Sequence, residues 1–209
     1  MSDLQPDVQS SPVTPGAGSA VLYVDTTSKE PAVKDAAGFI HGSVFNFSTA
    51  SQAPTAQVRT YITGSALAVP TGKLQIGTCF RWTFSMTKTG AGSATSTVAI
   101  AVGTAGTTAD TDRVSFTKPV GTAVIDEGTV TINAICRGPL SASGIFVGQF
   151  NLIHNLQITG HATIPCVCVN TVSAAFDVTV ANLIVGLTIT TGASDAITIQ
   201  LVQSEAWNL

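Results

Sequence analysis

The chain has 209 residues, of which 10% are charged and 44% hydrophobic, and its formal net charge is -3. Soluble domains usually carry about 25% charged residues, so this chain has little polar material with which to coat an isolated monomer. Its nine lysine and arginine residues are scattered, which excludes the basic stripe expected of a nucleic-acid-binding protein. No stretch is apolar for long enough to be a transmembrane helix. Part of the surface is therefore expected to be covered by other chains.

The N-terminal 18 residues are rich in proline, serine, glycine and glutamine. Such a segment buries too little apolar area to offset the entropy lost on ordering. Residues 1–18 are therefore predicted to be an extended arm that attaches to a neighbouring surface. The arm has neither a positively charged start nor an apolar h-region, so no secretory signal is expected. We expect the protein to be made in the cytoplasm and to have no membrane partner.

Residues 19–55 hold a run of β-forming residues, two turn-rich stretches and further short extended pieces. This pattern predicts a small β-hairpin or meander. Two or three short strands are marginally stable alone, so the unit is expected to dock on something larger. Phe45 and Phe47 continue the extended pattern. The following residues, 48–55, include Pro54 and are interpreted as the linker into the main domain.

Residues 56–209 are predicted to be the main domain, because strand-like runs separated by Gly-containing turns leave no room for βα units. The clearest alternation is in the run 79–88, where Phe80, Trp82 and Phe84 share one face. Half-buried strands of antiparallel sheets show this pattern. The predicted fold class is all-β, an antiparallel and jelly-roll-like β-sandwich. The expected strands are 57–62, 66–69, 79–88, 97–102, 113–117, 129–137, 145–155, 164–172, 183–190 and 196–202.

The polar residues show no catalytic constellation. Hydrolysis of a glycan needs two carboxylates about 5 to 10 Å apart. The local acidic pairs are Asp110 with Asp112 and Asp126 with Glu127, and both fall in predicted loops, where solvated turn residues are usual. The three histidines are interpreted as loop or strand-end residues with ordinary hydrogen-bond partners. We therefore expect no enzymatic activity.

The four cysteines lie in or beside apolar runs and are interpreted as reduced core residues. An alternative would join Cys166 and Cys168 with His154 and His161 in a zinc site. The C-x-C spacing without a second close pair does not match the usual structural zinc frameworks. Residues two apart on one strand are also about 7 Å apart, too far for an unstrained disulfide. We expect no metal and no other cofactor.

Several segments resemble a domain of virion structural proteins from tailed bacteriophages. These segments are 73–128, 160–165 (GHATIP) and 189–209, and 20–38 resembles the piece that often precedes such domains in phage fibre and head proteins. The resemblance covers residues 19–209. It implies a β-sandwich that assembles as a homotrimer on the virion surface, and it brings no catalytic residues.

A short chain with an N-terminal arm and no shaft repeat favours a capsid decoration or head-fibre protein over a tail fibre. We expect it to trimerise on the head and to attach, through its N-terminal region, to other virion proteins such as the major capsid protein. Its expected location is the virion, assembled in the bacterial host cytoplasm. The alternative is a tail or fibre component that could bind host-surface glycans.

Two strands that are apolar on both faces, at 145–155 and 164–172, are the predicted surfaces between subunits. The alternative is that both are central strands of the chain's own sandwich. The candidate interface residues are Ile145, Phe146, Val147, Phe150, Leu152, Ile164, Val167 and Val169.

Overall fold

The computed structural model of the chain contains three β-sheets and, among the residues it describes, no helix. In this part of the chain there is consequently no helix long and apolar enough to cross a membrane. Strands make up 51% of the structure, which confirms the predicted all-β class. The described residues are 8–9, 13–25, 31–35, 40–41, 43–90, 92–194 and 196–209.

A small N-terminal sheet has the strand order β1-β2-β3-β4. Strands β2 and β3 form the predicted hairpin, whereas β1, which lies within the predicted arm, pairs in parallel with β2. Most of the predicted arm lies outside the described residues. The strand bounds are β1 Val8–Gln9, β2 Ala20–Asp25, β3 Pro31–Asp35 and β4 Ile40–His41.

The larger sheet of the main domain is antiparallel and has the order β13-β12-β11-β8-β15-β5. Its edge strand β5 pairs with β15, so the sandwich begins at Ser43, ahead of the boundary predicted at residue 56. From the sequence, residues 43–48 are expected to lie outside the domain, because the alternation of apolar and polar residues within a strand does not show which strand it pairs with. The partner strand, β15, lies more than 150 residues further along the chain. The bounds are β5 Ser43–Ser48, β8 Cys79–Lys88, β11 Asp126–Cys136, β12 Phe146–His154, β13 Cys166–Val172 and β15 Ile197–Trp207.

The second sheet of the main domain has the order β10-β9-β14-β6, and β7 also pairs with β14. A strand therefore occurs in each of the ten predicted runs, and the antiparallel β-sandwich is confirmed. The jelly-roll path stays a prediction, and β11, β12 and β13 form a simple meander within one sheet. The bounds are β6 Thr60–Tyr61, β7 Leu67–Ala68, β9 Ser96–Gly103, β10 Thr111–Lys118 and β14 Ile184–Thr190.

The core lies between the two main sheets and is built around the predicted aromatic face of β8. The rings of Phe80 and Trp82 stack with centroids 5.9 Å apart, and Phe80 lies 5.5 Å from Phe146 on β12. The indole nitrogen of Trp82 donates a hydrogen bond to the Ser65 carbonyl at 2.8 Å, so its polar atom is satisfied. Aromatic side chains bury about 150–250 Å² each, so this face dominates the apolar burial of the sheet.

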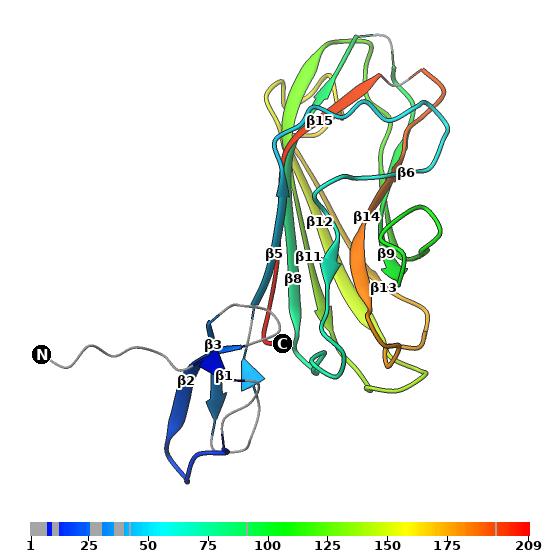
Figure 1. Cartoon of the computed structure of the whole chain (residues 1–209). Helices are drawn as coiled ribbons and strands as arrows, with labels where there is room; N and C mark the ends of the chain where they lie inside the picture. The colour runs from blue at the N-terminus through cyan, green and yellow to red at the C-terminus, as the bar shows by residue number, and fades with distance from the viewer. Residues whose placement is uncertain are drawn as a thin grey trace, which may run out of the picture.

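The sandwich has two distinct ends (Figure 1). The N-terminal sheet and the C-terminus lie at one end, which we call the proximal end. The loops 119–125 and 155–165 lie at the opposite end, which we call the distal end, because they follow the ends of β10 and β12 and precede β11 and β13.

Candidate functional site: the outer face of the six-stranded sheet

The side of the six-stranded sheet that faces away from the core carries side chains in regular rows across the strands. The row nearest the proximal end is apolar. Register pairs place its members side by side on β13, β12, β11, β8 and β15 as Val172, Val147, Ile135, Cys79 and Trp207. We call these five residues the apolar row. Ile135 and Val172 are about half exposed, at 47% and 49%, so the row presents apolar area to its surroundings.

The next two rows toward the distal end are mostly uncharged and polar. Among the outward-facing residues of β8, β11, β12, β13 and β15, the charged ones are Arg81, Glu127 and Glu205. The two rows consist of Asn170, Gln149, Asn133, Arg81, Glu205 and Phe45, and of Cys168, Asn151, Thr131, Thr83, Gln203 and Phe47.

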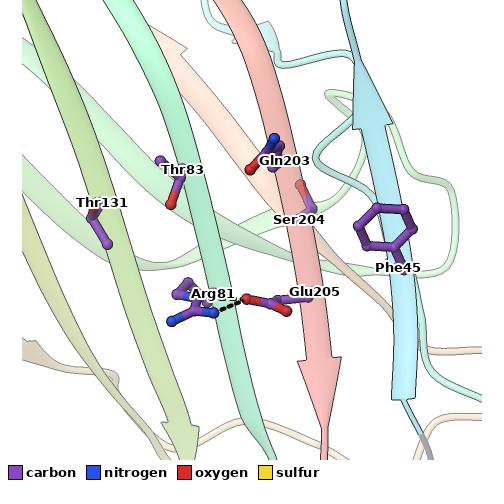
Figure 2. Close-up of a pocket in the computed structure, with 7 residues that line it drawn as sticks. All are labelled: Phe45, Arg81, Thr83, Thr131, Gln203, Ser204 and Glu205. Carbon is purple, nitrogen blue, oxygen red and sulfur yellow. Dashed lines mark hydrogen bonds and ion pairs between the residues drawn. The ribbon is translucent and has the colours of Figure 1, made fainter.

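A shallow groove lies on this face where β5, β15 and β8 adjoin (Figure 2). Phe45 and Trp207 contribute its aromatic walls, and Arg81 and Glu205 form an ion pair in its floor. The Arg81 guanidinium also lies over the Trp207 ring, 5.4 Å from the ring centroid. Both members of the ion pair are about half exposed, so it contributes at most about 1 kcal/mol to stability. Its chemical use is to present a fixed donor and acceptor.

The groove combines groups that can bind a sugar. Aromatic rings pack against the apolar face of a pyranose, while Arg81, Glu205 and Gln203 can donate to and accept from its hydroxyl groups. Hydrolysis is a different matter, because it needs two carboxylates. Glu205 is the one acidic residue among those that line the groove. The geometry therefore permits binding and supplies no second carboxylate for cleavage.

The histidines at the distal end form a buried polar cluster, which we tested as a catalytic site. Asp126 Oδ2 lies 2.6 Å from His154 Nδ1, in the manner of a carboxylate that orients a catalytic imidazole. However, His154 Nε2 lies 2.8 Å from the Ile164 carbonyl oxygen, and both side chains are fully buried. The second ring nitrogen is thus occupied by backbone, and no substrate can reach it. The pair is structural.

Asp126 also organises the backbone around it. Its carboxylate accepts hydrogen bonds from the amides of Leu156 at 3.2 Å and His161 at 3.0 Å. Burial alone would raise the pKa of Asp126, but the bonds from the His161 amide, the His154 ring and the Leu156 amide outweigh it and lower the pKa. Burial lowers the pKa of His161 to about 4, against smaller raising effects of its bond to the Met86 carbonyl and of Asp126. The carboxylate is therefore ionised, and His161 neutral, at pH 7.

Sequence reasoning placed His154 at a strand end correctly but did not find its partner, and it assigned Asp126 to a loop. The sequence did contain a signal for this pairing. Asp126 lies on the same face of β11 as Val130, and His154 lies on the same face of β12 as Leu152, and both faces point inward. A polar residue at an inward position predicts a buried partner.

The second acidic pair is also structural. Asp110 is buried and accepts hydrogen bonds from the amides of Ala105 at 2.9 Å and Gly106 at 2.8 Å, which closes the loop before β10. Asp112 pairs with Arg59, whose guanidinium also donates to the Asp110 carbonyl at 2.7 Å. Both carboxylates are thus engaged in holding loops.

The structure does not bring together the cysteines and histidines of the alternative zinc site, against which the C-x-C spacing argued. Cys166 and Cys168 are exposed on the outer face of the edge strand β13, whereas His154 and His161 are buried. The described residues hold no group of His, Cys, Asp and Glu that could bind a metal ion. The interpretation of the cysteines as core residues is wrong for these two, because they occupy the outward-facing positions of β13. It is also wrong for Cys79, which is partly exposed on the outward face of β8, whereas Cys136 is buried as expected.

The candidate interface residues divide into three groups. Ile164 is exposed, and Ile145 and Val147 are half-buried, so a second chain can reach these three. Val169 is partly buried and packs against the core. The remaining four point between the two sheets of this chain, as the alternative interpretation of these strands expected, and are unavailable to another subunit. They are Phe146, Phe150, Leu152 and Val167.

No known protein family matches the sequence, and no curated protein matches it significantly.

Proposed function

We propose that this chain is a structural subunit of a bacteriophage virion, a capsid decoration protein that trimerises on the head and attaches through its N-terminal region. The observation that carries the proposal is the outer face of the six-stranded sheet, whose outward-facing side chains on β8, β11, β12, β13 and β15 include one ion pair and one further charge. The apolar row on this face includes the exposed side chains of Ile135, Val172 and Trp207. An exposed apolar patch rimmed by polar residues marks a surface that another protein covers.

The position of the apolar row supports attachment at the proximal end. Trp207, at one end of the row, pairs with Ser43, the first residue of β5, and β5 follows the N-terminal sheet directly in the chain. A neighbour that holds the N-terminal region would therefore also reach the row. Burial contributes about 25 cal/mol per Å² of apolar surface, and two linked contacts bind more tightly than either alone.

The proposal is tested by the location of the protein in the virion. Purified protein is added to phage heads that lack it, and electron microscopy gives its position and copy number. We expect hundreds of copies on the head and loss of binding when residues 1–18 are deleted. A few copies confined to the tail would contradict head decoration. Light scattering on the isolated protein should give the mass of three chains, and a stable monomer would contradict the trimer.

The groove of Figure 2 favours a second candidate function, glycan binding by a tail or fibre component. The test is a glycan array with the full chain, followed by titration of any sugar that binds. Phe45→Ala should abolish binding, because Phe45 lines the groove, while Phe47→Ala is the matched control, since Phe47 is a similarly exposed ring outside the lining set. Binding unaffected by Phe45→Ala would exclude the groove as the site.

A further inference from the structure

Two loops at the distal end of the sandwich lie beside the end of β12 (Figure 1). Together with that strand end they carry a concentrated group of exposed aliphatic side chains. The loops, 119–125 and 155–165, contain no Asp, Glu, Lys or Arg residue. The exposed fractions of the group range from 41% to 66%. We call it the apolar tip, and its members are Val120, Val124, Ile125, Ile153, Leu156, Ile158 and Ile164.

The two loops form one continuous surface. The Thr122 amide donates to the Gly160 carbonyl at 2.9 Å, and the Gly160 amide donates to the Thr122 hydroxyl at 2.6 Å. The loops are also in close contact at Gly121, where an added Cβ would lie 2.1 Å from the Gly160 carbonyl oxygen. The apolar side chains therefore keep a fixed arrangement relative to one another.

Buried charges hold this surface from beneath. Lys88 and Lys118 are 0% and 1% exposed, and their ammonium groups donate to loop carbonyls, Lys88 to Thr122 at 2.7 Å and Lys118 to His161 at 2.7 Å. Asp126 binds loop 155–165 through the amides of Leu156 and His161, as described above. Burying an ammonium group costs several kcal/mol unless it is well bonded. These bonds fix the loop backbone, so the tip is shaped before any partner arrives, which lowers the entropic cost of binding.

We propose that copies of this chain associate through the apolar tip. The inference rests on the self-association in the proposed function and assigns it to a surface. Seven aliphatic side chains, each about half exposed, present several hundred Å² of apolar area, comparable to the roughly 800 Å² per partner of a standard interface. Ile164 was already a predicted interface residue, and Ile153 and Leu156 adjoin it, so the tip includes part of the predicted interface.

The chemistry of the tip selects the occupant. Lipid surfaces are bound by basic and aromatic residues, and the two loops contain no Lys, Arg, Trp, Tyr or Phe. The two loops offer a charged protein partner no opposite charge, and the outer face beside them carries the single carboxylate of Glu127 at the start of β11. Further copies of this chain offer the same rigid aliphatic surface, and three copies whose tips meet at a threefold axis close a symmetric trimer.

The test compares aspartate substitutions at three isoleucines of similar exposure. Ile125→Asp and Ile158→Asp change tip residues that are 65% and 66% exposed, and Ile76→Asp is the matched control, 61% exposed and outside the tip. Light scattering over a range of concentrations measures the mass of each full-length variant. We expect wild type and Ile76→Asp to associate equally, and both tip variants to be monomeric at the same concentration, with dissociation constants raised at least about tenfold. Retained association in both tip variants would overturn the proposal.

Two further measurements separate folding and function from association. Far-UV circular dichroism spectra should be the same for all three variants, since the three positions are exposed. In wild type, hydrogen exchange of residues 155–165 should slow as the protein concentration rises. Exchange there that does not depend on concentration would overturn the inference without any variant. A wild-type monomer that still binds phage heads would also overturn it; of the proposed function, it would contradict the trimer and leave head attachment standing. A protein that associates through the tip but binds no head would support the inference and contradict the function.

Discussion

Replacing Asp126 with alanine is expected to be among the most destabilising single changes in this protein. The carboxylate is fully buried and accepts four hydrogen bonds of 2.6 to 3.2 Å, from the amides of Glu127, Leu156 and His161 and from the His154 ring. Each buried donor left without a partner costs about 1–3 kcal/mol, and removal of one member of a buried charged pair costs about 3–5 kcal/mol. The Glu127 amide belongs to an exposed residue and can be rehydrated.

The expected loss for Asp126→Ala is therefore about 3–5 kcal/mol, a large part of the roughly 5–15 kcal/mol that stabilises a typical domain. Urea denaturation followed by circular dichroism measures it as a lower midpoint with an unchanged slope. The melting temperature should fall by roughly 10 °C, because 1 kcal/mol shifts Tm by about 2–4 °C in domains of this size.

The matched control is Asp177→Ala. Asp177 is exposed, and its carboxylate makes local bonds to the amide and hydroxyl of Thr179 at 2.8 and 2.6 Å. It should leave the melting temperature nearly unchanged. A loss below about 1 kcal/mol for Asp126→Ala would refute the reasoning, since a buried carboxylate with these partners cannot be removed so cheaply.

Three further predictions concern pH, packing and thiol reactivity. The pKa of His161 is about 4 in the folded protein and near 6.5 in the unfolded chain. Between these two pH values the unfolded chain binds more protons than the folded protein does. The free energy of unfolding should therefore fall by up to about 1.4 kcal/mol per pH unit as the pH drops from 6.5 to 4. Urea titrations at several pH values measure this, and a flat profile would contradict it. Gly148→Ala should lower the free energy of unfolding by about 1–3 kcal/mol, because the added Cβ would lie 2.7 Å from a ring carbon of Phe116 in the facing sheet. An unchanged melting curve would argue against that contact. Cys166 and Cys168 are exposed and should react with a thiol reagent in the native protein. Cys136 should react only on unfolding, because it is buried and burial raises its pKa. Labelling of Cys136 in the native protein would be inconsistent with its place in the core.

The strands of the main domain could be predicted from the sequence because alternation is a local property. A strand whose even positions are apolar needs only one covered face to be stable, whichever strand lies beside it. The run 79–88 was predicted with the bounds that β8 has, and its apolar parity faces the core. Continued to the end of the strand, the same alternation places Lys88 on the inward face. The sequence therefore already contained a signal for the unusual burial of this lysine.

The candidate surfaces depended on tertiary structure, because they are made by pairing between distant segments. The groove exists only because β5 and β15 adjoin, which brings Phe45 next to Glu205. The apolar tip exists because β11 and β12 pair in a register that places Gly128 opposite His154 and so brings Asp126 to the histidine ring. Alternation determines which side of a strand is covered, and it contains no information about which strand is the neighbour. The sequence by itself therefore determined the strands and the sandwich class, while long-range register decided which side chains share a surface.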